Sequence, residues 1–297
     1  MVLAGDNVTD DAGYAFGLPG DVDGDGLGDI LVGAPGVDTG GLDTGVAYLV
    51  NVGGSSGSLA DTAEAELYGG PDSGWFGLSI DPAGDTNGDG LADFLVGSHG
   101  ISLQGAVYLV EGPISGFVAM PDVATAYWTG EAENDLALSG VGLGDVNGDG
   151  SADVAIESPR AGAGGVVFID LGPLAGGDSV AFVDLAVRGG STSYSFGLAA
   201  SVGDLDGDGS DDLAVGDYSD TSAGEDAGAV WVFTGLQAGT YDTDDAAGSW
   251  VGGPSDELAS VVGVGDTDGD GAREVLAGAL GADTVATAGG AAALLEW

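Results

Sequence analysis

Nine-residue acidic segments recur five times in this chain, and their side chains could bind a hard cation. Each segment has an oxygen-bearing side chain at positions one, three, five and nine and a glycine at position six. Ca²⁺ prefers oxygen ligands of this kind, and the glycine permits the sharp turn that a short binding loop requires. The spacing therefore predicts five calcium sites, in what we call acidic loops one to five. In chain order the loops span residues 21–29, 85–93, 145–153, 204–212 and 266–274.

The predicted side-chain ligands are the residues at positions one, three, five and nine of each loop. Asp, Asn and Gly are also common in exposed turns, but five copies in one register are not expected from turns alone. The predicted ligands are Asp21, Asp23, Asp25, Asp29, Asp85, Asn87, Asp89, Asp93, Asp145, Asn147, Asp149, Asp153, Asp204, Asp206, Asp208, Asp212, Asp266, Asp268, Asp270 and Glu274.

An EF-hand also begins with this pattern, but it needs a bidentate Glu at position twelve and a helix on each side. Position twelve is apolar in every copy here, so it cannot bind calcium. The residue at position nine must therefore complete each site, and the chain continues directly into an apolar segment. The apolar residues at position twelve are Val32, Val96, Ile156, Val215 and Ala277.

The loops recur with a period near sixty residues, since their first residues are 64, 60, 59 and 62 positions apart. This period fits one four-stranded propeller blade with generous loops. The chain shows no sustained 3.6-residue apolar period, so we predict an all-β fold. Residues 1–297 are predicted to form a single domain, a five-bladed β-propeller with four-stranded antiparallel blades.

Short apolar segments at matching places in each repeat are the expected strands. Four matching aromatic residues, Tyr48, Tyr108, Phe168 and Trp231, are expected to pack between neighbouring blades, and Ala293 interrupts this series. The expected first strands are 16–18, 76–78 and 196–198; the second are 30–32, 94–96, 154–156, 213–215 and 275–277; the third are 45–50, 105–110, 165–170, 228–233 and 290–295; the fourth are 67–68, 127–128, 186–187 and 249–250.

The fifth repeat has three expected strands and lacks a fourth. Val2–Gly5 precedes Phe16 much as Leu67–Gly69 precedes Phe76, so the first segment of the chain has the character of a fourth strand. We therefore predict that the N-terminal strand completes the last blade and closes a ring, which would remove two open sheet edges. The alternative is that the chain is a fragment of a larger propeller.

The composition excludes several classes of function. The formal net charge is −46, with three Lys and Arg residues in 297, so nucleic acid and anionic membrane surfaces are not expected partners. Without cysteine, the chain has no disulfides and no thiol chemistry. The first residues lack the features of a signal peptide and no run of 18 apolar residues occurs. We expect a soluble, monomeric domain, mature or excised from a larger protein.

Few residues outside the loops could support catalysis. A glycosidase would need two converging carboxylates, and Asp81, Glu157 and Asp217 are candidates. Glu157 replaces the glycine that ends the second strand in the other repeats. His99 is the single histidine, so a Ser-His-Asp triad and a multi-histidine metal site are not expected. Calcium held fully by protein oxygens has no open position for a reactant.

The sequences around the loops resemble a known repeat. Phe16-Gly17 before the first loop and Gly33-Ala34-Pro35 after it are similar to the FG-GAP repeat of integrin alpha-subunit propellers and their bacterial relatives. The resemblance covers essentially the whole chain, although integrin propellers have seven blades. It implies calcium between the first two strands of each blade. It also implies backbone carbonyl ligands at position seven, which is Leu27, Leu91, Ser151, Ser210 or Ala272.

We therefore predict a calcium-stabilised, non-catalytic binding or adhesion module at the cell surface or in the extracellular space. Its partner would be a protein or a glycan that binds loops on one face of the propeller. Two alternatives stay open: a calcium-dependent carbohydrate-active enzyme, and a purely structural scaffold that is engineered or excised.

Overall fold

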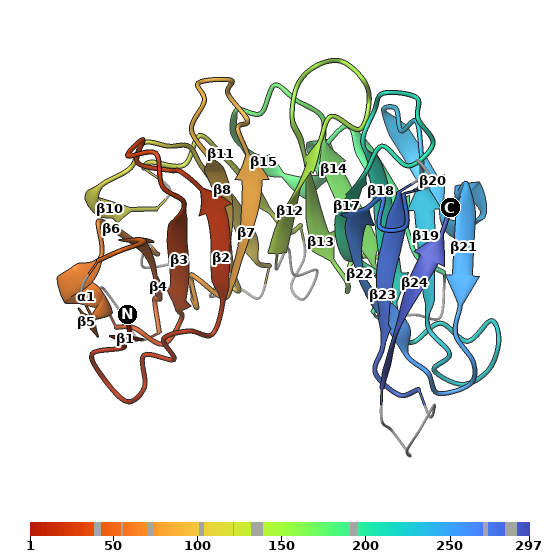
Figure 1. Cartoon of the computed structure of the whole chain (residues 1–297), viewed down its shortest axis with the longest axis horizontal. Helices are drawn as coiled ribbons and strands as arrows, with labels where there is room; N and C mark the ends of the chain where they lie inside the picture. The colour runs from red at the N-terminus through yellow and green to blue at the C-terminus, as the bar shows by residue number, and fades with distance from the viewer. Residues whose placement is uncertain are drawn as a thin grey trace. The chain divides into compact units, whose positions relative to one another are not determined.

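The chain folds into β-sheets, as the computed structural model in Figure 1 shows. The structure describes residues 1–38, 43–54, 56–69, 74–100, 104–120, 122–131, 139–190, 195–269, 273–282 and 290–297. Helical segments within these ranges are α1 (Leu59–Thr62) and the 3₁₀ turns η1 (Val180–Phe182) and η2 (Thr243–Asp245). None of these helices is long and apolar enough to cross a membrane. The predicted all-β class is confirmed.

The chain divides into two compact units, of which the first comprises Met1–Gly142 and Pro173–Phe182. This unit contains two sheets of similar construction, each with four antiparallel strands and a fifth, parallel strand at one edge. The first sheet contains β2 (Phe16–Gly20), β3 (Asp29–Ala34), β4 (Val46–Asn51), β6 (Ala65–Tyr68) and β10 (Gly116–Ala119); the second contains β7 (Ser79–Gly84), β8 (Asp93–Ser98), β9 (Ala106–Val110), β11 (Ala126–Thr129) and β15 (Gly176–Ser179).

The second unit comprises Leu143–Gly172 and Val183–Trp297. It contains three sheets, and β12 of the third sheet begins in the first unit. The third sheet contains β12 (Ser139–Gly144), β13 (Asp153–Ser158), β14 (Val166–Asp170), β16 (Leu185–Arg188) and β20 (Gly239–Asp242); the fourth contains β17 (Leu198–Gly203), β18 (Asp212–Asp217), β19 (Ala229–Phe233) and β21 (Gly248–Val251); the fifth contains β22 (Leu258–Gly265), β23 (Glu274–Ala279) and β24 (Ala291–Glu296).

The second and third strands of a sheet read as continuous apolar runs because the sheets stack face to face within each unit. Every residue of β8 and β9 is buried, which is typical of strands covered on both faces. Leu31 and Leu49 of the first sheet share one core cluster with Phe94, Val96 and Tyr108 of the second. The fourth and fifth sheets share another, in which Ala214 and Val232 lie with Val275 and Ala277.

The second, third and fourth strands were predicted correctly, whereas two of the first strands begin later than predicted. Phe76 forms an isolated bridge with Gly45, and β7 begins at Ser79. Leu198 is the first residue of β17, after Phe196. The reason is conformational: Gly77 and Gly197 have φ angles of 85° and 129°, which extended strands do not adopt.

A fifth strand in three of the sheets was not predicted. β10, β15 and β20 pair in parallel with β6, β11 and β16 of the preceding sheet. The same parallel arrangement joins β5 (Gly57–Ser58) to β1 (Leu3–Ala4). These strands are short, begin with glycine and pair with residues far away in the sequence, so no local apolar pattern marks them.

The predicted pairing of the N-terminal strand with the last blade is not confirmed. β1 pairs with β5, and β24 pairs with β23 in a sheet whose described strands are β22, β23 and β24. The five sheets of three or more described strands correspond one to one with the five repeats, so their number agrees with the sequence period.

The matching aromatic residues lie in or beside the cores. Tyr108 packs in the cluster shared by the first two sheets, as predicted, and its ring lies 5.7 Å from that of Phe76. Tyr48 is buried near Leu59 of α1. Trp231 is half-buried, with its ring 5.8 Å from that of Phe196.

Candidate metal centres

Each acidic loop connects the first and second strands of its sheet, and the residue at position nine begins the second strand. A register shift in loops one, two, four and five aligns this residue with the glycine that precedes the loop. Both ends of the loop are therefore fixed by the sheet. The residues at position nine are Asp29, Asp93, Asp153, Asp212 and Glu274.

The first aspartate of each loop organises the loop backbone around its own carboxylate. In loops one to four this carboxylate accepts hydrogen bonds from the N–H groups at positions four and six, over 2.7 to 3.0 Å. In loop five, the N–H of Gly269 donates to Asp266 over 2.6 Å. The described glycines at positions four and six have positive φ angles, which glycine adopts without a Cβ penalty. The backbone thus turns tightly around the predicted site.

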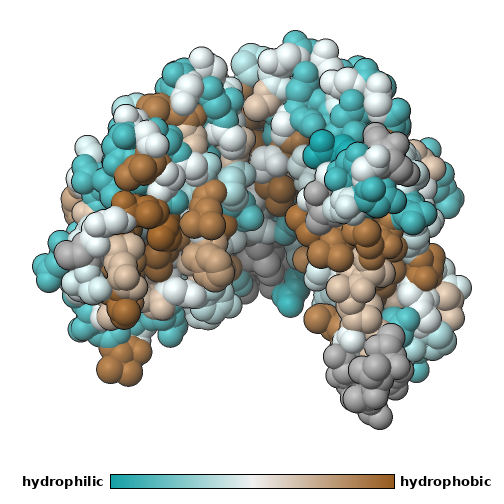
Figure 2. Space-filling view, in the orientation of Figure 1, coloured by the Kyte–Doolittle hydropathy of each residue, from teal (hydrophilic) through white to brown (hydrophobic). Residues whose placement is uncertain are grey.

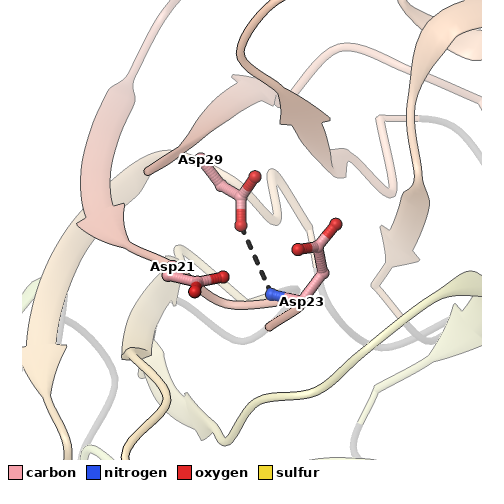
Figure 3. A group of neighbouring side chains, drawn as sticks. All are labelled: Asp21, Asp23 and Asp29. Carbon is pink, nitrogen blue, oxygen red and sulfur yellow. Dashed lines mark hydrogen bonds between the residues drawn. The ribbon is translucent and has the colours of Figure 1, made fainter. Parts of the chain in front are cut away.

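Among the described residues, carboxylates come close together in loops one, four and five. In each of these loops, one oxygen from each of three carboxylates lies within 4.8 Å of the other two. Figure 3 shows the group in loop one. Carboxylates this close repel one another unless a cation lies between them. The three groups are Asp21, Asp23 and Asp29; Asp204, Asp206 and Asp208; and Asp266, Asp268 and Glu274.

The carboxylate at position nine is buried in all five loops. One of its oxygens accepts a hydrogen bond from the N–H at position two, as in the bond from Val22 to Asp29 Oδ2 at 2.9 Å. In loops one and four, the second oxygen, Oδ1 of Asp29 or Asp212, is buried with no hydrogen-bond partner. A buried, unpaired carboxylate oxygen is costly. A cation bound there would satisfy this oxygen, so these residues fit Ca²⁺.

In loops two and three, the second oxygen of the position-nine carboxylate accepts a hydrogen bond from a backbone N–H group. Asp93 Oδ1 accepts the N–H of Gly112 at 3.0 Å, and Asp153 Oδ1 accepts the N–H of Gly172 at 2.8 Å. Both glycines follow the third strand of their sheet, nineteen residues beyond the carboxylate. Sequence analysis missed these donors, because no local pattern identifies an N–H so far along the chain.

Burial changes the acidity of these carboxylates. Desolvation raises the pKa of Asp29 and Asp93, and it raises the pKa of Asp153 and Asp212 to about 6. Hydrogen bonds from the backbone oppose this effect, and nearby carboxylates of the same loop add to it in loops one, three and four. Without a cation, the negative charge at position nine of loops one to four is therefore unfavourable in the folded protein.

This effect predicts opposite pH dependences with and without calcium. In calcium-free buffer, the carboxylates of Asp29, Asp93, Asp153 and Asp212 hold protons more tightly in the folded state than in the unfolded state. Stability should therefore fall as the pH rises from about 4 to about 6. In millimolar calcium, protons compete with the cation, so stability should rise over the same range. Thermal melts in Chelex-treated and calcium-containing buffers would test this, and stability that rises with pH in both buffers would contradict it.

Parts of the predicted sites are not covered by these observations. Asp270 and Ala272 of loop five lie outside the described residues. In loop one, the side chains at positions three and five accept N–H groups two residues ahead: Asp23 from Asp25 at 2.9 Å, and Asp25 from Leu27 at 2.7 Å. The carbonyl ligands at position seven stay predictions.

The candidate catalytic residues in the second unit have structural contacts. Glu157 Oε1 accepts the N–H of Ala199 at 2.6 Å, which ties β13 to β17. Buried Asp217 accepts hydrogen bonds from the hydroxyls of Ser195 and Ser219. Both carboxylates thus hold neighbouring segments together.

The third candidate carboxylate, Asp81, and the single histidine, His99, belong to the first unit. Burial raises the pKa of Asp81, in β7, to about 6. His99 follows β8, and its ring lies 5.8 Å from that of Trp75.

Comparisons with known proteins agree with the sequence pattern. Residues 196–233 match the FG-GAP repeat family. This segment contains acidic loop four and strands β17, β18 and β19.

Several curated relatives are integrin alpha subunits. Integrin alpha-PS2 of Drosophila melanogaster is 36% identical over 126 residues, which is 40% of this chain and 9% of the relative. Integrin alpha-7 of Rattus norvegicus is 34% identical over 159 residues, 53% of this chain and 14% of the relative. Integrin alpha-PS3 of Drosophila melanogaster is 34% identical over 184 residues, 58% of this chain and 16% of the relative. The chain thus spans less than a fifth of each relative. The predicted resemblance is confirmed: residues 196–233 match the FG-GAP repeat family, and the chain is similar to integrin alpha subunits.

Proposed function

We propose that this protein is a calcium-stabilised, non-catalytic binding or adhesion module that acts at the cell surface or in the extracellular space. The observation that carries this proposal is the pair of buried, unpaired oxygens of Asp29 and Asp212. Each oxygen belongs to a loop in which three carboxylates have oxygens within 4.8 Å of one another. In loop one this group includes Asp29, and in loop four it consists of the carboxylates at positions one, three and five. Ca²⁺ is the cation that such a set of hard oxygen ligands favours, and it is abundant outside cells.

We propose five calcium ions per chain, one in each acidic loop. All five loops share the buried carboxylate at position nine and the place between the first two strands, and loops one to four share the same turn. In this arrangement calcium holds the loop between the first two strands of each blade. Its role is to stabilise the sheet, and it takes no part in a reaction. The proposed ligands are the side chains at positions one, three, five and nine, with the carbonyl oxygen at position seven.

We also propose that the five sheets form a single propeller domain, closed by the N-terminal strand. β1 pairs with β5 just as β6 pairs with β10, which gives β1 the place of a blade's outermost antiparallel strand. In a closed ring, β1 would also pair with the free edge of β24.

The exposure of apolar residues supports closure. In four sheets, a pair of residues facing each other on the second and third strands is almost fully buried, at 0–1% exposure. The matching pair in the fifth sheet, Leu276 and Leu294, is 36% and 51% exposed. Phe16 of the first sheet is 71% exposed, whereas the matching Phe76 and Phe196 are fully buried. Figure 2 shows apolar surface over β23 and β24. Closure would cover these surfaces.

The proposed partner is a protein or a glycan bound by loops of several blades. The net charge of −46 favours a cationic protein surface, or a neutral glycan bridged by calcium, over a polyanion. The matching loops differ in length among the repeats: Gly36–Thr44 and Ser219–Ala227 are long, and Gly100–Gln104 is short. Loops on such a scaffold are common binding elements. The module is expected to act as a monomer.

The functional test is calcium-dependent binding without catalysis. The purified chain would be screened on glycan arrays and on adhesion to cells, in calcium and in EDTA. We expect binding in calcium that falls when Ser219–Ala227 is replaced by a short turn, and unchanged binding for Glu157→Gln. Glycan cleavage by the chain, abolished by Glu157→Gln, would support the carbohydrate-active enzyme instead. Equal binding in calcium and EDTA would contradict the proposal.

A further inference from the structure

Neighbouring acidic loops within a unit are joined through the residue at position eight. In the first unit, the N–H of Ala92 in loop two donates to the carbonyl oxygen of Asp21 in loop one at 2.8 Å. In the second unit, the N–H of Asp211 in loop four donates to the carbonyl oxygen of Asp145 in loop three at 2.8 Å. Asp21 and Asp145 are the first proposed ligands of their loops. The start of one site is thus held by the loop that follows.

The side chain at position eight lies against the glycine that precedes the earlier loop. A Cβ atom on Gly144 would lie 2.0 Å from Asp211 Oδ2, and a Cβ on Gly203 would lie 2.7 Å from Cζ of Arg273. Both glycines also have positive φ angles, 77° and 70°. They therefore leave space for a side chain from the next repeat, immediately beside the first residue of loop three or loop four.

The charge at position eight differs among the loops. It is neutral in loops one, two and three, where the residues are Gly28, Ala92 and Ala152. In loop four it is the carboxylate of Asp211, whose Oδ2 accepts the N–H of Asp145 at 3.1 Å. In loop five it is the guanidinium of Arg273. Loop three therefore has an additional negative charge beside it, and loop four has a positive charge beside it.

We propose that Asp211 and Arg273 set the calcium affinities of the preceding loops, so that Asp211 strengthens binding in loop three and Arg273 weakens binding in loop four. This inference rests on the proposed calcium binding. A charge close to a divalent cation changes its binding energy directly, and the partly exposed setting reduces this effect without removing it. Asp211 also holds the backbone of Asp145, so it acts as a positioning residue and not as a ligand.

Site-resolved calcium titration tests this inference. The amides of Gly150 and Gly209 donate to the first carboxylates of loops three and four, so their ¹H–¹⁵N NMR signals should report on each loop separately. Asp211→Asn should weaken loop three by about five- to tenfold, and loop four less. Arg273→Gln should tighten loop four by about threefold, and Arg273→Lys should leave it near the parent value.

Controls separate charge from folding and from long-range effects. Asp244→Asn removes one exposed negative charge from the second unit outside the loops, and it should leave loops three and four unchanged. Gly26 of loop one, in the first unit, serves as a reference outside the second unit. Raising the salt concentration from 0.05 to 0.5 M should reduce the differences between the variants and the parent. A native NMR spectrum in excess calcium would show that each variant folds.

The outcomes distinguish this inference from the calcium proposal. If calcium shifts none of the loop glycines of the parent protein, both proposals fail. If the parent binds calcium but Asp211→Asn and Arg273→Gln bind it as the parent does, the tuning inference alone is wrong. It is also wrong if Asp211→Asn weakens loop four as much as loop three, because the substitution would then have no specific effect on the preceding loop.

Discussion

Removing calcium is expected to lower the melting temperature of this protein by about 10–15 °C, the largest effect that we anticipate. A site with a dissociation constant of about 10⁻⁴ M contributes about 1.4 kcal/mol at millimolar calcium. Five such sites contribute about 7 kcal/mol, which is comparable to the net stability of a whole domain. Differential scanning calorimetry in calcium and in EDTA, with isothermal titration to count the ions, measures both quantities.

Single-loop variants make this test specific. Asp29→Asn and Asp212→Asn neutralise the carboxylates whose second oxygens are buried and unpaired. Each variant should lose one bound ion and about a fifth of the calcium-dependent stability, whereas Asp244→Asn should lose neither. A melting temperature that is indifferent to EDTA, or a stoichiometry of one ion or none, would contradict calcium stabilisation.

Leu294→Asn is expected to destabilise the protein by about 2–4 kcal/mol if the N-terminal strand closes the ring, because this side chain would then be buried between blades. Deleting residues 1–8 should have a related effect: it would free the edge of the last sheet and promote association. Chemical denaturation and sedimentation velocity would measure the two outcomes.

The matched control for this prediction is Leu280→Asn. Leu280 is 69% exposed and lies beyond the end of β23, so its substitution should change stability by less than about 0.5 kcal/mol. If Leu294→Asn has an equally small effect and the shortened chain stays monomeric with the melting temperature of the parent, closure by the N-terminal strand is wrong.

The acidic loops could be predicted from the sequence because their chemistry is local. All proposed ligands of a loop fall within nine residues, and the glycines that allow its turn lie between them. The second and third strands were predictable for a similar reason: stacking buries both faces, so strands such as β8 and β9 are continuous apolar runs.

The features that were missed depend on partners far away in the sequence. β10 is a four-residue strand, too short to show a recognisable period, and it is defined by its pairing with β6 and by the stacking of Phe117 on Tyr68 at 4.2 Å. Glu157 was considered as a catalytic carboxylate because it replaces a glycine of the other repeats. In the structure its carboxylate accepts a hydrogen bond from the N–H of Ala199, 42 residues away in the sequence. Local spacing carries no information on such contacts.

The parallel fifth strands also determine how this architecture can be lengthened, shortened or recombined. Because β10, β15 and β20 complete the edge of the preceding sheet, the borders of a sheet and of a sixty-residue repeat do not coincide. Joining two repeats at equivalent positions keeps every strand with a partner, wherever in the repeat the junction lies. A single sheet transplanted as a block would lack one strand and present an open edge. Engineering of this scaffold should therefore insert or delete whole repeats at equivalent positions.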